Sequence, residues 1–257
     1  MRNILCLLAL VGAFELTAQT KDSLPARVYS LNALKNMSDA GGLRKNIMNG
    51  STTSLAGFEV QAYTLLAGKK QQNRLMNEQD ELIIVKNGDL KITHNELAKQ
   101  LGKGGISFTM AGDTRAIENT GATSATYYRF IYHSKLPSNI ERAKQNGGSF
   151  FINWNDVPVE KTDKGHRRAF FNKPTAQLVK LEMHTTALNA GLDSHAPHTH
   201  IEEEIILLLK GDVKMFINGK LYKAAPGDVV FLPSGVLHAL ENTGKEQCEY
   251  FAFQWRN

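Results

Sequence analysis

The sequence predicts an all-β protein made of two like domains, and three observations support this prediction. The chain matches itself at a constant offset of 123 residues, its apolar runs are short, and Gly, Pro or Asn separates one run from the next. No long stretch has the 3.6-residue periodicity of a helix. Many short strands joined by tight turns are typical of a β-sandwich or a β-barrel.

The internal repeat spans most of the chain. It runs without a gap from Val28 against Phe151 to Ser134 against Asn257. Identical residues at the offset of 123 include the pairs Gly68 and Gly191, Glu81 and Glu204, Gly88 and Gly211, Asp89 and Asp212, and Phe130 and Phe253. Because chance does not keep one offset over so long a stretch, the repeat indicates a duplicated domain. We expect the two copies to pack on each other by pseudo-twofold symmetry.

The repeat also predicts the domain boundaries. The first copy covers residues 26–135 and the second covers residues 149–257. Residues 136–148 between them contain a proline and two glycines, which are typical of a linker. The segment NIERAKQ inside this linker has room for one or two helical turns.

The second copy shows the expected strands most clearly. They read QLVKLEMHTTAL (177–188), EIILLL (204–209), KMFING (214–219), KLYKA (220–224), DVVFLP (228–233) and EYFAFQW (249–255), all rich in apolar and β-favouring residues. Asn218-Gly219 predicts a tight hairpin, because both residues tolerate positive φ. In the first run, His184 shares a face with Lys180 and Glu182, and we expect that face to be exposed.

Residues 1–18, MRNILCLLALVGAFELTA, have the pattern of a secretory signal peptide: a basic start, an apolar stretch and small residues near the cut. The apolar stretch is shorter than the ~20 residues that a membrane span needs. We therefore expect a secreted or periplasmic protein, and a buried N-terminal strand or helix is the alternative. Cleavage would leave Cys248 as the one cysteine, so no intramolecular disulfide would form, and we expect Cys248 to lie in the core.

Composition excludes several classes of protein. Hydrophobic residues make up 42% of the 257 residues and charged residues 21%, as in ordinary globular domains. Lys plus Arg number 30 against 25 Asp plus Glu, a net charge of +5 that no basic run concentrates, so we expect no nucleic-acid partner. After residue 18 no apolar segment is long enough to cross a bilayer, so we expect no membrane partner either.

Four residues of the second copy have the side chains of a metal site. His198 and His200 alternate, so a strand would point both imidazoles the same way. Glu204 follows on the next predicted strand, and His238 comes from a later one, after the rigid segment 233–235. Three neutral imidazoles and one carboxylate suit a single divalent transition metal (Mn, Fe, Ni, Cu or Zn), with open positions for water or substrate.

Two neighbours of these residues have roles that the sequence leaves open. His195 and Glu203 lie close to the four in sequence. They are expected either to orient a ligand by hydrogen bonding or to lie in solvent.

Around the four residues the sequence resembles the two motifs of the cupins, small jelly-roll β-barrels. HTHIEEEIILLLKG, from His198 through Glu204 to Gly211, is similar to the first motif, although Gly191 lies one residue further from the first histidine than usual. GDVVFLPSGVLHALEN, which contains His238, is similar to the second. The resemblance implies that His198, His200, Glu204 and His238 bind one metal ion. It also implies a bicupin: two tandem cupin-type jelly-roll barrels related by internal duplication.

The first copy has lost most of this set. At the offset of 123, Leu75 stands for His198, Asn77 for His200, Met110 for Pro233 and Arg115 for His238, while Glu81 matches Glu204. Leucine cannot coordinate a metal, and arginine carries a permanent positive charge. We therefore expect an N-terminal barrel without metal in which Arg115 pairs with Glu81. The alternative is that Arg115 holds an anionic ligand.

A centre of this kind favours an enzyme without choosing the reaction. Cupin metals serve dioxygenases and also Lewis-acid isomerases, hydrolases and lyases. An exported enzyme would meet sugar acids or phenolics, so we expect a small oxygen-rich substrate at the metal and Glu204 as the candidate catalytic residue. The layout is also similar to that of ureidoglycine aminohydrolase, whose ligand set differs. The alternatives are a non-catalytic cupin that binds a small ligand and a protein in which the metal is structural. The sequence also leaves a homodimer open.

Overall fold

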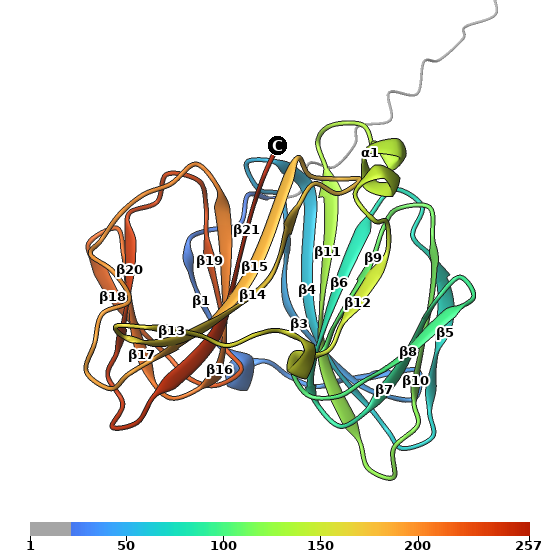
Figure 1. Cartoon of the computed structure of the whole chain (residues 1–257), viewed down its shortest axis with the longest axis horizontal. Coiled ribbons are helices and arrows are strands. Elements are labelled where there is room, and N and C mark those ends of the chain that lie inside the picture. Colours follow the sequence, from blue (N-terminus) through green and yellow to red (C-terminus); the bar gives the residue numbers. More distant parts are fainter. Residues whose placement is uncertain (1–21) are drawn as a thin grey trace, which may run out of the picture.

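The computed structural model describes residues 22–257, and its strands form four β-sheets (Figure 1). Two seven-stranded sheets lie next to each other in the middle of the molecule, and the two smaller sheets lie on the outer sides. The predicted all-β class is confirmed. The predicted signal peptide, residues 1–18, lies outside the described residues. In the part described, no helix has the length and apolar character needed to cross a bilayer.

The N-terminal barrel consists of one large and one small sheet. Its strands are β2 (Met37–Asp39), β3 (Gly42–Gly50), β4 (Leu55–Leu65), β5 (Lys70–Leu75), β6 (Asp80–Asn87), β7 (Leu90–His94), β8 (Leu97–Leu101), β9 (Ile106–Thr109), β10 (Thr114–Asn119) and β11 (Ala125–Ser134). The large sheet has the order β12-β9-β6-β11-β4-β3-β2, where β12 is Phe150–Ile152, and the small sheet the order β5-β10-β7-β8. All pairings are antiparallel, as a jelly roll requires.

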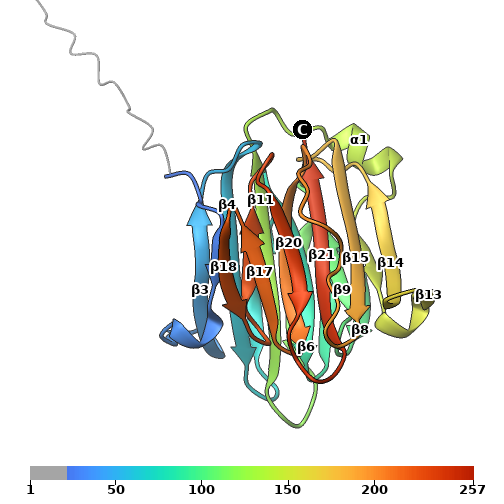
Figure 2. The same ribbon diagram turned by 90° about the vertical axis from the view of Figure 1, so that its left-hand side faces the viewer.

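The C-terminal barrel repeats this design. Its strands are β13 (Glu160–Thr162), β14 (Gly165–Lys173), β15 (Lys180–Leu188), β16 (Glu203–Lys210), β17 (Val213–Ile217), β18 (Lys220–Ala224), β19 (Val229–Leu232), β20 (His238–Asn242) and β21 (Cys248–Arg256). The large sheet has the order β1-β19-β16-β21-β15-β14-β13, where β1 is Arg27–Tyr29, and the small sheet the order β18-β17-β20. Figure 2 views this barrel with its small sheet in front.

Strand bounds follow the sequence offset closely. β6, β7 and β8 map onto β16, β17 and β18 residue for residue when 123 is added. The exception is β5, because the matching residues 193–198 form only isolated bridges, Asp193 with Glu241 and His198 with His238. The C-terminal barrel thus has a loop where the N-terminal barrel has an edge strand.

The two halves exchange their first strands. β1 (Arg27–Tyr29) pairs with β19, with Val28 opposite Val230. Reciprocally, β12 (Phe150–Ile152) pairs with β9, with Phe151 opposite Ser107. The predicted domain boundaries stay a prediction. β1 belongs to the first copy in sequence but to the large sheet of the C-terminal barrel, and β12 belongs to the second copy but to the large sheet of the N-terminal barrel.

Short connecting elements agree with the sequence. The predicted linker helix is confirmed as α1 (Ile140–Gln145), and the side chain of Asn139 caps it by accepting a hydrogen bond from the Arg142 amide. The predicted hairpin between β17 and β18 is also confirmed, because Asn218 and Gly219 have φ values of 45° and 82°. Two single-turn 3₁₀ helices, Leu31–Ala33 and Trp154–Asp156, follow the exchanged strands.

The main core lies between the two large sheets. It contains side chains from both halves, and repeat-related aromatic residues meet there. Phe130 and Phe253 have ring centroids 4.8 Å apart, and Tyr132 and Trp255 have centroids 5.6 Å apart. Since each pair differs by 123, an approximate twofold axis runs between the partners, which confirms the expected symmetry. Each barrel has a further apolar cluster of its own, and Cys248 is fully buried in that of the C-terminal barrel.

Two buried acids tie the halves together across this core. Glu203 is 1% exposed and accepts hydrogen bonds from the Thr52 hydroxyl (2.8 Å), the Thr53 amide (2.9 Å) and the Trp255 indole (3.1 Å). Its repeat equivalent, Asp80, accepts from the amide of Gln177 (3.0 Å). The expectation that Glu203 orients a metal ligand or lies in solvent is therefore wrong. Its face of β16 is turned away from the barrel interior and is covered by the other half.

Candidate metal centre

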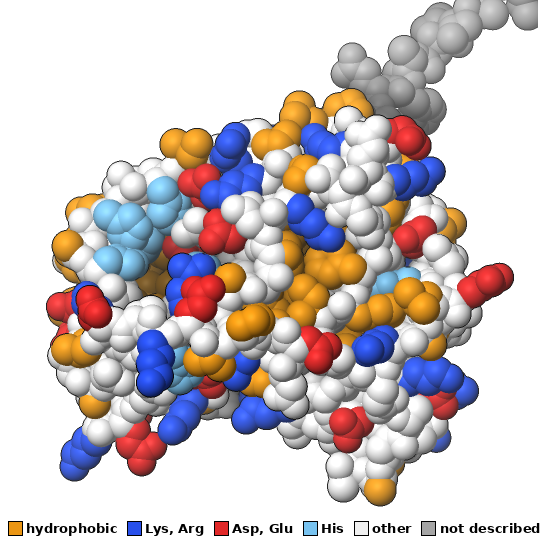
Figure 3. All heavy atoms as spheres, viewed as in Figure 1, with side chains coloured by type: hydrophobic (Ala, Val, Ile, Leu, Met, Phe, Trp, Pro, Cys, Tyr) orange, Lys and Arg blue, Asp and Glu red, His pale blue; other side chains and the backbone are white. Residues whose placement is uncertain are grey.

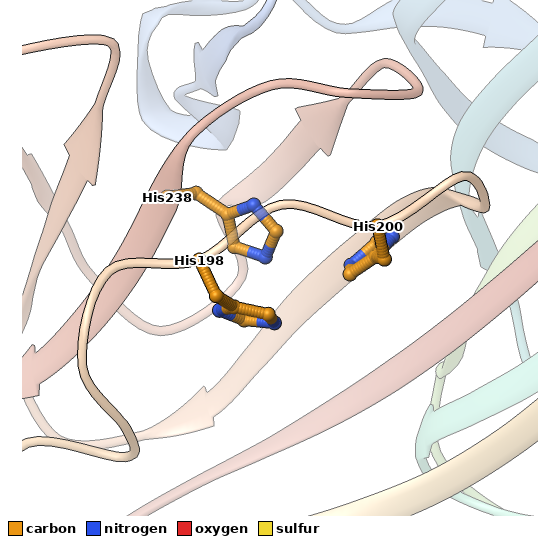
Figure 4. Close-up of side chains that lie close together, drawn as sticks. All are labelled: His198, His200 and His238. Atoms are coloured by element: carbon orange, nitrogen blue, oxygen red, sulfur yellow. The ribbon is translucent and has the colours of Figure 1, made fainter.

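Three imidazoles converge in the C-terminal barrel. The ligand nitrogens of His198, His200 and His238 lie within 4.8 Å of one another, and Figure 4 shows the rings turned toward a common space. His198 and His238 are fixed by reciprocal backbone hydrogen bonds of 3.1 and 3.0 Å. The expected strand under His198 and His200 is wrong, because only His198 makes a bridge and the segment is otherwise irregular. The bridge to β20 nevertheless brings the two side chains to His238.

Glu204, at the start of β16, closes the group. Its Oε2 atom lies 3.2 Å from Nε2 of His200 and 3.2 Å from Nε2 of His238, and the residue is 6% exposed. All four residues predicted as ligands therefore share one site. That they bind a metal stays a prediction.

Backbone carbonyls set the imidazole tautomers. Nδ1 of His200 donates to the Glu202 carbonyl and Nδ1 of His238 donates to the Val236 carbonyl, both at 2.8 Å. With the proton on Nδ1, the Nε2 atom of a neutral ring offers a lone pair. Both lone pairs then face the same carboxylate oxygen of Glu204. Lone pairs and an anionic oxygen repel one another, so the arrangement is stable only when a proton or a cation lies among them.

The electrostatics agree with a cation-binding group. Burial opposes the charge of Glu204, but the adjacent imidazoles of His200 and His238 outweigh it and lower the pKa of Glu204 to about 2. The hydrogen bond to Glu204 raises the pKa of His200, whereas burial and the neighbouring histidines lower the pKa of His198. Among the described residues, Nε2 of His238 and Nδ1 of His198 are buried without a hydrogen-bond partner. Three imidazoles and an ionised carboxylate fit a divalent transition metal.

A cavity of about 470 Å³ opens beside these residues. Its remaining polar lining comes from the large sheet, the β13–β14 turn and the loop 193–198: Thr162, Asp163, Lys164, Arg167, His184, Thr186, Ser194, His195, Tyr250 and Gln254. In Figure 3, pale-blue histidine atoms gather at this hollowed side of the C-terminal barrel. The centre is therefore open to a small molecule and not sealed by protein.

His184 is a site residue that the sequence analysis missed. The predicted alternation along β15 is correct, but the expected exposure of its polar face is wrong, because that face lines the cavity. Burial lowers the pKa of His184, and its Nδ1 atom is buried without a hydrogen bond among residues 22–257. The repeat could have predicted this position. If each large sheet packs with one face on the other half, its opposite face must line the interior of its own barrel.

Two positively charged side chains, Lys164 and Arg167, line the cavity. Nζ of Lys164 donates to the carbonyls of Asp193 (2.7 Å) and Ser194 (3.2 Å), and so holds the loop that carries His195. His195 is exposed, with its ring 4.1 Å from the ring of His198. Arg167 is 44% exposed and forms an ion pair with Glu160 at 3.4 Å. Two positively charged side chains therefore lie at the wall beside the centre, together with the acids Glu160 and Asp163.

The N-terminal barrel has an ion pair at the equivalent position. Nε and Nη2 of Arg115 donate to the two carboxylate oxygens of Glu81 at 2.7 and 2.9 Å. The predicted pairing of Arg115 with Glu81 is confirmed. Leu75, which replaces His198, is 52% exposed.

Comparisons with known proteins agree with this architecture. Residues 184–253 match the family model described as Cupin domain. The structure of protein Ylba from E. coli is similar with a TM-score of 0.71 and 16% identity, over 93% of this chain and 94% of that chain. AerE from Microcystis aeruginosa gives 0.68 and 14%, over 87% and 97%. The formate complex of Lactobacillus farciminis oxalate decarboxylase gives 0.69 and 13%, over 92% and 88%. At these identities the structures show the fold alone. No curated protein sequence matches the chain.

Proposed function

Because residues 184–253 match the Cupin domain model and the chain shares its fold with oxalate decarboxylase, we propose that it is a metal-dependent enzyme that acts on a small oxygen-rich acid in its C-terminal barrel. The observation that carries the proposal is the convergence of His198, His200, His238 and Glu204 at one wall of an open cavity. These four residues would hold one divalent transition metal. When bound, that metal would supply Lewis-acid or redox chemistry to a substrate oxygen.

The cavity lining supports a carboxylate-bearing substrate, such as a sugar acid or a phenolic acid. Arg167 offers a guanidinium, whose fork matches a carboxylate. Lys164 adds a second positive charge and fixes the opposite loop. Together they would orient the acid group while its reactive end lies at the centre.

His184 is the residue that we propose for proton transfer. It faces the cavity, burial lowers its pKa so that the ring is neutral at pH 7, and its Nδ1 atom lies 3.6 Å from a carboxylate oxygen of Glu182, with which it could exchange a proton. Glu204 is a weaker candidate, since two histidines contact its carboxylate and its pKa of about 2 makes it a poor base. We therefore give Glu204 the role of ligand.

Manganese is the first metal to test. Similar folds include oxalate decarboxylases, and the Bacillus subtilis enzyme has Mn(II) centres. Elemental analysis of natively purified protein should give about one transition metal per chain. The same sample should then be screened with carboxylic acids for substrate loss and for oxygen uptake. Oxygen uptake would indicate a dioxygenase, and loss without it an isomerase, hydrolase or lyase.

Failure of this screen has a clear meaning. Protein that holds no stoichiometric metal after native purification and after loading with Mn, Fe, Ni, Cu or Zn contradicts the proposal. Metal with saturable acid binding but no turnover would favour the non-catalytic ligand-binding cupin instead.

We also propose that the protein acts in the periplasm or outside the cell. The support is the signal-peptide pattern of residues 1–18. Cell fractionation of the full chain and of a chain starting at residue 19 tests it, and retention of both in the cytoplasm would contradict it.

A further inference from the structure

The N-terminal barrel contains a cavity at the place equivalent to the candidate metal centre. It measures about 270 Å³. Seven of its nine lining residues map onto the lining of the larger cavity when 123 is added, namely Asp39, Ala40, Tyr63, Gln71, Gln72, Arg115 and Arg129 onto Thr162, Asp163, Thr186, Ser194, His195, His238 and Ala252. The duplication has therefore kept a ligand-sized space in the half that lost the metal ligands.

Three guanidinium groups line this cavity. Arg115, 1% exposed, is paired with Glu81 through two hydrogen bonds. Arg129 is 8% exposed, donates to the Gln61 side chain, and lies 3.7 Å from Glu81. Arg74 donates to the Gln79 side chain at 2.9 Å. Two of the three arginines thus have a neutral amide as their hydrogen-bonded side-chain partner.

The acids near this cluster do not balance its charge. Asp39 lines the cavity, but it forms an ion pair of 3.0 Å with Arg44. Glu81 and Glu59 are the acids whose charges act on Arg74, so two carboxylates face three guanidinium groups. Burial raises the pKa of Tyr63, and the tyrosine is therefore neutral. One positive charge is left over.

That excess charge is not relieved by loss of a proton. Burial, followed by the charges of Arg129 and Arg115, lowers the pKa of Arg74, but a guanidinium is so strong a base that it stays charged at neutral pH. A partly buried positive charge without a counter-charge is costly. An anion inside the cavity would remove that cost.

We propose that the N-terminal barrel binds a small oxyanion, of the carboxylate or phosphate type, between Arg74, Arg115 and Arg129. The guanidinium fork matches both groups, and the amides of Gln71 and Asn73 supply neutral donors on the same wall. Stacking of Arg129 on the ring of Tyr63, with its guanidinium carbon 4.8 Å from the ring centre, fixes the plane of that fork. This site does not depend on metal in the other barrel.

Calorimetric titration of the full-length protein tests the proposal, with malonate and inorganic phosphate as probes. One saturable site should persist in His198→Ala protein, which removes the C-terminal centre. Arg74→Gln and Arg129→Gln should each weaken that site at least about tenfold. The matched control is Arg27→Gln, an exposed arginine remote from the cavity.

Arg74 and Arg129 are chosen because their substitution leaves the pair of Arg115 with Glu81 intact, and melting temperatures without probe verify that the variants are folded. The probe that binds more tightly identifies the oxyanion. Absence of saturable binding by either probe in His198→Ala protein overturns the proposal. Binding that survives both arginine substitutions overturns it as well.

Discussion

In the N-terminal barrel Glu81 is neutralised by Arg115, whereas the equivalent Glu204 of the C-terminal barrel faces His200 and His238. Both carboxylates are buried and ionised, since their pKa values are lowered despite burial. In the N-terminal barrel the positive charge that balances the carboxylate comes from Arg115. In the C-terminal barrel it must come from a protonated histidine or from a bound cation. Three of the four positions differ between the barrels, and the exchange of His238 for Arg115 is the one that gives the buried carboxylate a partner within the chain.

A second difference is the edge beside the two cavities. β5 closes the small sheet in the N-terminal barrel, and the loop 193–198 takes its place in the C-terminal barrel. The larger cavity, about 470 against 270 Å³, lies beside the loop. The loop that replaces the strand brings His195 and His198 to the lining of the larger cavity.

The largest expected effect is on metal binding, and only substitution in the C-terminal barrel should cause it. His198→Ala should lower metal affinity by more than about 100-fold and abolish turnover, because an open site with three remaining ligands binds weakly. Leu75→Ala, the substitution at the equivalent position, should change neither. Elemental analysis and the substrate screen are the measurements. Stoichiometric metal in the His198→Ala protein would refute the ligand assignment.

Loss of the internal counter-charge should destabilise the N-terminal barrel. Arg115→Met leaves Glu81 buried without its bidentate partner, so the free energy of unfolding should fall by about 3–5 kcal/mol. Urea denaturation measures it. The double variant Arg115→Met, Glu81→Gln is the control and should recover much of the loss. A single variant within about 1 kcal/mol of the parent would show that Arg129 alone neutralises Glu81.

The pH dependence of stability should separate the barrels as well. His94 is 4% exposed, and burial lowers its pKa from 6.5 to about 4, whereas the equivalent residue is Ile217. A pKa that is lower in the folded state gives stability that is full above pH 6.5 and is lost as the pH falls through 4. His94 should therefore contribute about 3 kcal/mol of acid destabilisation.

Urea unfolding of the parent and of His94→Gln at pH 7, 5 and 4 measures this contribution. The difference between the two proteins should change with pH, because acids elsewhere titrate equally in both. Parallel curves for the two proteins would place the proton uptake on other groups.

The smallest effect is expected for substrate orientation. Arg167→Gln should raise KM for the acid found in the screen by about 3- to 10-fold and leave kcat within about twofold, because the side chain is 44% exposed and acts on binding. Arg44→Gln, at the equivalent position of the other barrel, should leave both constants unchanged. An equal change in both variants would point to a general charge effect.

The sequence predicted the features that depend on local pattern and on the repeat. The duplication, the hairpin at Asn218, the linker helix and the pairing of Arg115 with Glu81 are all confirmed. The grouping of His198, His200, Glu204 and His238 also followed from the two motifs. In each of these cases a few residues close in sequence, or at one offset, carry the information.

The errors concern strand faces whose surroundings come from distant parts of the chain. His184 and Glu203 lie on polar faces of their strands, and alternation identifies a face but not what covers it. One of these faces lines the cavity and the other is buried between the halves. The pairing of β1 with β19 had no signal either, because it joins residues about 200 positions apart, and such pairing is not recorded in local pattern.

The strand exchange makes each half incomplete without the other. A chain cut in the segment 136–148 would leave β19 without β1 in one fragment and β9 without β12 in the other. Each fragment would then expose a bare strand edge, the kind of template on which copies of a protein add to one another and aggregate. Duplication has thus produced a molecule whose halves are alike in plan but are obliged to fold in each other's presence.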